Sequence, residues 1–130
     1  MKTVALALGF LLASGAMARA QGADGVCVKH ISVPTYPPLA RAAGVQGTVQ
    51  VDVSIGSDGK VRSAKASGGR ELINKAAEEN MREWIFCSSA QGNYSTKYVY
   101  LIEEQNEPTR VSFDLPEEVK IVTSPVRGGY

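Results

Sequence analysis

Side chains that could do chemistry are few and scattered in this 130-residue chain. His30 is the single histidine, and no serine, aspartate or cysteine stands in a nucleophile elbow or a phosphate-binding loop. Glu78, Glu79 and Glu83 fall on the polar side of a predicted helix, where solvation is the ordinary role of a carboxylate. The sequence therefore predicts neither an enzyme nor a metal or cofactor site.

The chain has two cysteines, Cys27 and Cys87, and both follow an N-terminal segment typical of export. An even number of cysteines in an exported chain favours a disulfide. A bridge across so long a loop would restrict the unfolded chain strongly. Redox or metal use is one alternative, although no Cys-x-x-Cys motif is present. A pair of free, buried cysteines is the other.

The elements that would carry these side chains begin with a short helix and a strand. Pro37 and Pro38 fix φ at a helix start, and Gly44 is a natural left-handed stop for that helix. Residues Thr48–Ile55 alternate between polar and apolar types, which predicts a strand with one buried face and one solvated face.

A hairpin and an amphipathic helix follow. Asp58-Gly59 can adopt the positive φ of a tight turn. The parity of the apolar residues changes within Val61–Ala66, so the second strand needs a bulge or a strong twist to keep one face buried. From Arg70 to Phe86 apolar residues recur at three- and four-residue steps, which predicts a helix with one buried face. Its solvated side carries the i,i+4 pair Glu78 and Arg82.

In this order, the motifs resemble the C-terminal domain of TonB-family proteins. The residues that carry the resemblance are Tyr36-Pro37, Arg41 to Gly44, Gly47, Asp58-Gly59, and Trp84 followed by Phe86. It extends from about Pro34 to Glu104. The resemblance implies an α+β fold, with two helices on one face of a small antiparallel sheet in the order α-β-β-α-β. It also implies binding of a short extended segment of an outer-membrane transporter.

The two ends of the chain extend beyond this resemblance. Lys2, a short apolar run and the motif Ala18-Arg19-Ala20 predict a signal peptide at residues 1–20. An extended segment at 21–33, the domain at 34–104 and a β-rich tail at 105–130 would follow. The expected location is periplasmic or secreted. An uncleaved inner-membrane anchor facing the periplasm is the alternative, but the apolar stretch is shorter than the roughly 20 residues of a spanning helix.

The family's energy transducers have an inner-membrane anchor and a long proline-rich spacer, and neither is expected here. A cleaved signal leaves no inner-membrane anchor, and the short segment before Tyr36 is not proline-rich. We therefore expect the binding domain of the family without the membrane anchor and the proline-rich spacer of its energy transducers.

The last strand of the resemblance, Lys97–Ile102, is apolar or aromatic on both faces. One face carries Val99 and Leu101, and the other carries Tyr98, Tyr100 and Ile102. A half-buried antiparallel strand normally keeps one face polar, so a cover is expected. The tail can supply it with two short strands, one around Val111 to Leu115 and one around Val119 to Ile121. A partner protein or a second copy is the other cover, and the two could compete.

Two functions are compatible with these residues. The first is a periplasmic protein-interaction module that adds an extended segment of an envelope or outer-membrane transporter protein to a strand edge. By the resemblance, the partner-binding residues are Lys97, Tyr98, Val99, Tyr100, Leu101, Ile102, Tyr36 and Pro37. The second is an assembly domain that forms a homodimer through the same strand, with no transport role. Dispersed charges predict no nucleic-acid partner, and no membrane insertion is expected after signal cleavage.

Overall fold

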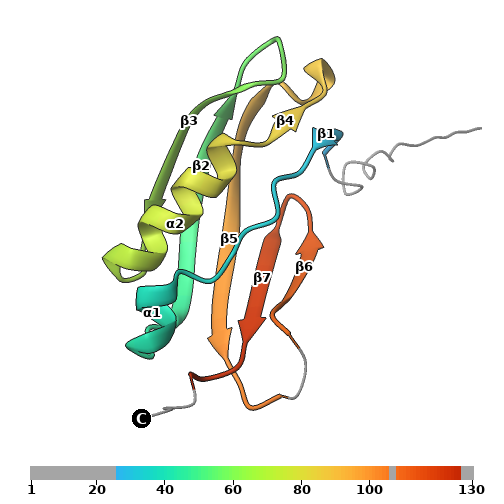
Figure 1. Cartoon of the computed structure of the whole chain (residues 1–130). Coiled ribbons are helices and arrows are strands. Elements are labelled where there is room, and N and C mark those ends of the chain that lie inside the picture. The colour runs from blue at the N-terminus through green and yellow to red at the C-terminus, as the bar shows by residue number, and fades with distance from the viewer. Residues whose placement is uncertain (1–25, 106–107, 127–130) are drawn as a thin grey trace, which may run out of the picture.

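A computed structural model describes residues 26–105 and 108–126. These residues form an α+β fold with a five-stranded sheet, in the order β3-β2-β5-β7-β6, and a two-stranded sheet of β1 and β4. Both α-helices lie on the same side of the large sheet (Figure 1). In chain order the elements are β1 (Val28–His30), α1 (Pro38–Ala42), β2 (Gly47–Ile55), β3 (Val61–Ser67), α2 (Glu71–Arg82), β4 (Ile85–Phe86), β5 (Gly92–Ile102), β6 (Arg110–Asp114) and β7 (Glu118–Thr123).

The signal peptide predicted at residues 1–20 lies outside the described residues, as do residues 21–25 of the extended segment and 127–130 of the tail. Within the described part of the chain, neither α-helix is long and apolar enough to cross a membrane.

The core is organised around β2. Its apolar residues are buried, as their alternation predicts: Val49, Val51, Val53 and Ile55. β3 pairs with one edge of β2 and β5 with the other, both antiparallel. The predicted irregularity in the β2–β3 pair is present, because the pairing register shifts between Ser54 and Ile55. Burial of one face then holds the register of the whole ladder.

The short first helix and the tight turn are also confirmed. α1 begins directly after Pro37, and the chain leaves it through Gly44 with a φ of +71°. In the β2–β3 turn Gly59 has a φ of +83°, and a Cβ there would collide with the carbonyl oxygen of Phe86. Glycine is therefore required at position 59 both for the turn and for the close approach of β4.

α2 is shorter than the sequence predicts. It spans Glu71–Arg82 instead of continuing to Phe86, and Glu83 is its C-cap. The backbone beyond the cap pairs with distant segments. The N–H of Phe86 donates to the carbonyl of Gly59 at 2.8 Å, and Phe86 pairs with Val28 in the small sheet. A helical spacing of apolar residues could not distinguish this short strand from a last helical turn.

The tail forms the two predicted strands and adds them to the sheet. β7 lies between β5 and β6, so the tail covers the edge of β5. β7 is parallel to β5, however, and the sheet is mixed rather than antiparallel throughout as expected. The cause is the connection: the chain passes from β5 to the outermost position, forms β6, and returns through a hairpin into the gap (Figure 1).

Cys27 and Cys87 form the predicted disulfide, with a sequence separation of 60 residues. Beside it the N–H of Cys87 donates to the carbonyl of Cys27 at 3.0 Å. The bridge therefore fastens the first described residues to the segment that follows α2.

Loss of this bridge should reduce stability substantially. For a loop of this length, the chain-entropy model gives a loss of about 4 kcal/mol in the free energy of unfolding. Urea denaturation of the oxidised chain with and without a reductant measures the difference. The double variant Cys27→Ser/Cys87→Ser is the control, because its midpoint should be low and insensitive to the reductant. Equal midpoints for the oxidised and reduced chains would contradict this account.

Candidate functional site

The strand predicted to bind a partner has both of its edges paired. β2 occupies one edge of β5, and the segment Lys97–Ile102 pairs on its other edge with Glu118–Thr123 of β7. Two further backbone bonds flank this ladder. The N–H of Lys97 donates to the carbonyl of Glu117 at 2.9 Å, and the N–H of Glu103 donates to that of Thr123 at 2.8 Å. In this conformation, the tail occupies the edge that a partner segment would need.

Tyr98 lies in the core, at the centre of a buried polar network. Its side chain is 0% exposed, and its hydroxyl donates to Asn80 Oδ1 at 2.8 Å. The same oxygen accepts from Trp84 Nε1 at 3.0 Å, while Asn80 Nδ2 donates to the carbonyl of Ser32 at 2.8 Å. Asn80 thus joins β5, α2 and the N-terminal segment. Burial, followed by the nearby Tyr100, raises the pKa of Tyr98 far above its usual range.

Tyr100 is equally buried but differs in its hydrogen bonding. Its hydroxyl has no hydrogen-bond partner among the described residues. Its ring meets that of Tyr36 edge to face, with 5.4 Å between the centroids. The Tyr36 hydroxyl donates to the carbonyl of Val45 at 2.6 Å, which ties the entry of α1 to its exit. Burial raises the pKa of both tyrosines, and for Tyr100 the neighbouring Tyr36 adds to the effect.

The structure therefore brings together the predicted residues Tyr36, Tyr98 and Tyr100, but on the core side. Pro37 is half-buried beside them at the start of α1. The remaining predicted residues are more accessible: Lys97 is exposed, and Val99, Leu101 and Ile102 are half-buried. Contact between a partner and Tyr98 or Tyr100 stays a prediction, and it requires β7 to leave its place.

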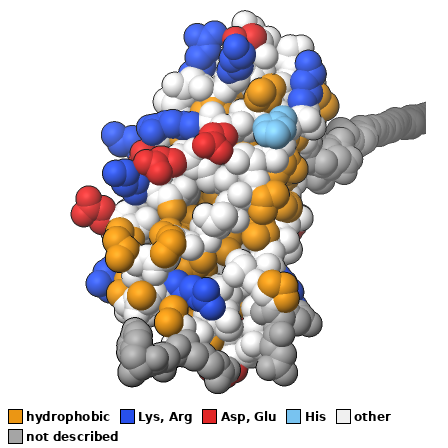
Figure 2. Space-filling view, viewed as in Figure 1, with side chains coloured by type: hydrophobic (Ala, Val, Ile, Leu, Met, Phe, Trp, Pro, Cys, Tyr) orange, Lys and Arg blue, Asp and Glu red, His pale blue; other side chains and the backbone are white. Residues whose placement is uncertain are grey.

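The helix-covered face presents a mixed surface. In Figure 2, charged side chains gather over α2 and β3, and apolar side chains are exposed through the middle and lower parts of this face. A hollow of about 310 Å³ lies between the N-terminal segment Val33–Tyr36 and the β6–β7 hairpin, and Val111 and Thr123 contribute to its wall. Toward the opposite end of β6, the ring of Phe113 is 36% exposed and contacts the ring of Trp84 edge to face, with 5.8 Å between the ring centroids.

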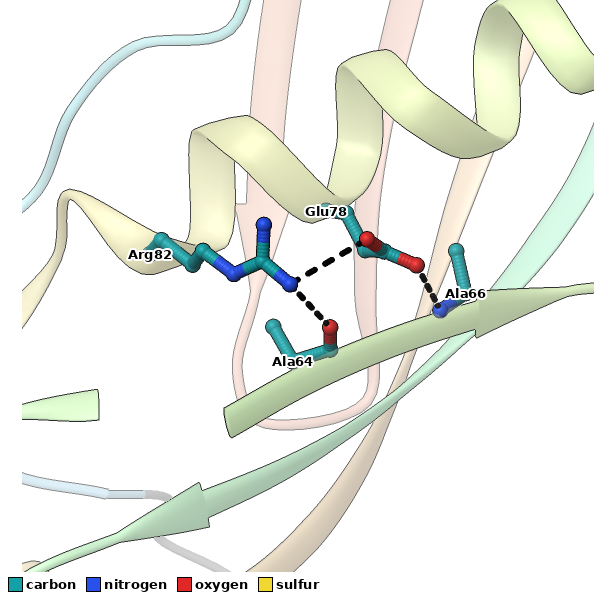
Figure 3. Close-up of polar contacts among 4 residues, drawn as sticks. All are labelled: Ala64, Ala66, Glu78 and Arg82. Carbon is teal, nitrogen blue, oxygen red and sulfur yellow. Dashed lines mark hydrogen bonds and ion pairs between the residues drawn. The ribbon is translucent and has the colours of Figure 1, made fainter. Parts of the chain in front are cut away.

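The outer edge of β3 is protected by side chains from α2 (Figure 3). Glu78 Oε2 accepts the N–H of Ala66 at 2.9 Å, and Arg82 Nη2 donates to the carbonyl of Ala64 at 3.2 Å. The two side chains also form an ion pair at 3.3 Å. A strand arriving at β3 would have to displace both of them. The sequence indicated only an i,i+4 pair on a wet helix face, because which strand lies under the helix is not visible in a local pattern.

Comparison with known proteins identifies the family. Residues 32–103 match the family described as Gram-negative bacterial TonB protein C-terminal, which is more than half of the chain. The chain therefore belongs to the TonB C-terminal domain family. The match ends one residue after β5, so β6 and β7 lie outside it.

Several curated relatives are similar over this region. Protein TonB of Yersinia enterocolitica is 34% identical over 71 residues, covering 53% of this chain and 28% of the relative. Protein TonB of Xanthomonas campestris is 39% identical over 64 residues, covering 47% and 28%. Protein tonB2 of Pseudomonas aeruginosa is 34% identical over 67 residues, covering 49% and 24%. The chain thus spans about a quarter of the length of these relatives. No solved structure matches it.

The two buried tyrosines should respond differently to removal of their hydroxyls. Tyr98→Phe deletes a buried hydrogen bond to Asn80 and should cost about 1 to 2 kcal/mol of stability. Tyr100→Phe removes a buried hydroxyl that has no partner in the described residues, so it should be neutral or stabilising by up to about 1 kcal/mol. Urea denaturation of both variants measures the contrast, and equal losses would contradict the network described here.

Stability should fall at alkaline pH, because burial raises the pKa of Tyr98 and Tyr100 in the folded state. Below the unfolded value of about 10, both states keep these phenols protonated and their contribution is complete. Above it the unfolded chain ionises first, so stability declines as pH rises. Urea midpoints from about pH 8 to about pH 11 test this. The double variant Tyr98→Phe/Tyr100→Phe should decline less steeply, and an equally steep decline would exclude these two groups as its cause.

Proposed function

We propose that this chain is a protein-interaction module of the cell envelope that binds an extended segment of another envelope protein by strand addition. The position of β7 carries the proposal. This segment lies outside the residues that match the family, yet it pairs with Lys97–Ile102 of β5 as an added parallel strand. β5 therefore has the backbone geometry to receive an extended chain. In this mode of recognition main-chain hydrogen bonds supply the affinity and side-chain pockets supply the choice.

The proposed partner class follows from family membership. The relatives carry the name TonB, and the resemblance implies as partner a short extended segment of an outer-membrane transporter. Because the chain spans about a quarter of these relatives, the transporter partner and a role in TonB-dependent transport both belong to the proposal. A signal peptide at residues 1–20 would deliver the binding unit, residues 34–104, to the periplasm.

The predicted site residues take two roles in this proposal. The backbone groups of Lys97 to Ile102 pair with the partner segment. Tyr98 and Tyr100 lie on the core face of β5, under the position of the partner segment. Tyr36, whose ring contacts Tyr100, and Pro37 place α1 next to β5. The outer edge of β3 is a weaker candidate, because Glu78 and Arg82 already bond to its backbone.

A homodimer through the same strand is the structural alternative. Such a dimer would have to bury Tyr98 and Tyr100, which β7 and the helices already bury completely within one chain. The dimer therefore needs the same displacement of β7, and no separate observation favours it.

Strand addition can be tested with backbone-modified peptides. The purified chain is titrated, by fluorescence anisotropy, with labelled ten-residue peptides that together cover the sequence of an outer-membrane transporter. We expect N-methylation at alternate residues of a binding peptide to weaken binding at least about tenfold, because every second N–H of a strand faces its neighbour. N-methylation at the intervening residues should change the affinity by less than about twofold. A uniform response along the peptide would rule out strand addition.

A pair of variants locates the site on the protein. Leu101 is half-buried on β5, and Leu72 is 41% exposed on α2. Leu101→Asp should raise the dissociation rate of the bound peptide at least about tenfold, because a charge would then border the paired segment, and this rate does not depend on how often β7 occupies the edge of the free chain. Leu72→Asp should leave binding unchanged. Similar effects of the two substitutions would place the binding site away from β5.

A further inference from the structure

The β6–β7 hairpin occupies the proposed peptide-binding edge as a peptide would. Its inner strand pairs with β5 along the whole segment Lys97–Ile102, in parallel and without an irregularity of register. It belongs to the same chain but lies beyond the family match, which ends at residue 103. The domain that the family shares is therefore one unit, and the strand that completes its sheet is an addition from the tail.

Burial along β7 shows which side chains this edge accepts. Val119 and Ile121 are completely buried, and Thr123 is 1% exposed. All three are β-branched and alternate along the strand, so their side chains share the core face. On the other face of β7, Lys120 is exposed and Glu118 half-buried, whereas Val122 is 7% exposed. The edge is thus shaped for an extended segment with branched aliphatic or threonine side chains at every second position.

The hairpin is held at its periphery by a small number of side-chain contacts. On β6, Phe113 rests its ring edge on Trp84. At the end of β7, Arg41 of α1 donates from Nε to the carbonyl of Ser124 at 2.7 Å and from Nη2 to its hydroxyl at 3.1 Å. β6 is the outermost strand, and its residues Ser112 and Asp114 are exposed. Departure of the hairpin would break the β5–β7 ladder and uncover the core side of β5, but the pairings among β2, β3 and β5 involve no hairpin residue.

We infer that the β6–β7 hairpin is an intramolecular competitor for the peptide-binding edge, and that its β7 strand is the template for the partner. This inference rests on the proposed function and extends it to the partner's sequence and to regulation. The partner segment runs parallel to β5 and places β-branched side chains where Val119, Ile121 and Thr123 now lie. Its apparent affinity is reduced by the fraction of molecules in which the hairpin is closed, so weakening the hairpin strengthens binding.

The test uses a peptide with the sequence of β7 as the probe. A labelled synthetic peptide of residues 117–124 is titrated into the wild-type chain and into Ile121→Thr, which keeps β-branching but loses apolar burial. Ile73→Thr is the matched control, because Ile73 is also 0% exposed but lies on α2. Ile121→Thr should bind the peptide at least about tenfold more tightly than the wild type, because its closed fraction is smaller. Ile73→Thr and a scrambled peptide should show no such gain.

A second variant keeps the test decisive if Ile121→Thr does not fold. Arg41→Ala removes the two bonds to Ser124 without opening the core, and it should raise the affinity for the same peptide severalfold. Hydrogen exchange of the wild-type chain gives an independent readout. With the peptide at about ten millimolar, above the roughly millimolar effective concentration of the tethered strand, the amides of β7 should lose protection while those of β2 keep it.

Three outcomes would overturn the inference. These are equal peptide affinities for the wild type and both hairpin variants, an equal gain for Ile73→Thr, and β7 amides that stay protected when the peptide binds. The last outcome would place the peptide on another edge, such as that of β6. Failure of the proposed function is distinguishable, because it appears as absence of transporter-peptide binding to the wild type and to Ile121→Thr alike.

Discussion

Backbone pairing on both sides of β5 is the interaction on which most of the structure depends. β2 pairs with one edge and β7 with the other, and between them Tyr98 and Tyr100 lie completely buried beneath the helices. An aromatic side chain buries about 150–250 Å², so rings beside an open edge would lose part of a large favourable contribution. Asn80 ties Tyr98 to α2 and to the N-terminal segment. The tail therefore completes the core of a domain whose family match ends before it.

The local patterns of the sequence predicted the local structure well. Alternation predicted β2 together with its buried face, and Gly44 and Gly59 stand where the backbone needs a positive φ. The change of apolar parity after Lys60 indicated the register shift that is present in the β2–β3 pair. These successes share one cause: each feature is decided by residues only a few positions apart.

What the sequence could not predict depends on contacts between distant residues. The helical spacing of apolar residues continues through Trp84 and Ile85, but pairing with the N-terminal segment draws Ile85 and Phe86 into a strand. The direction of β7 relative to β5 follows from the path of the tail around the sheet rather than from its alternation. Glu78 and Arg82 have the spacing of a solvated ion pair, and only the placement of α2 over β3 turns them into edge protection.

The outer edge of β3 and the β7-paired edge of β5 are consequently protected against an incoming strand in different ways. At β3, side chains bond to the edge backbone, which is a common protection against unwanted pairing. At β5, the edge is closed by a strand of the chain itself. The side chains that cover β3 leave no space in which a strand could fit. When β7 departs from β5, by contrast, it leaves unpaired backbone groups and a row of empty side-chain positions that another strand could occupy. Only the second arrangement is suited to exchange with another segment.

Exchange at β5 also sets a requirement on any partner. Burial of Val119 and Ile121 together contributes roughly 3 to 6 kcal/mol, and a partner with the same side chains recovers the same amount. A strand joined by a short connection has an effective concentration on the order of millimolar. A micromolar partner with identical contacts is thus outcompeted about a thousandfold, which corresponds to about 4 kcal/mol. A partner must therefore bring contacts that β7 lacks, such as pairing beyond Thr123, or it must be concentrated locally by attachment to the same assembly. Under either condition, the hairpin would keep unrelated extended segments off the edge of β5 but would be displaced by the partner segment.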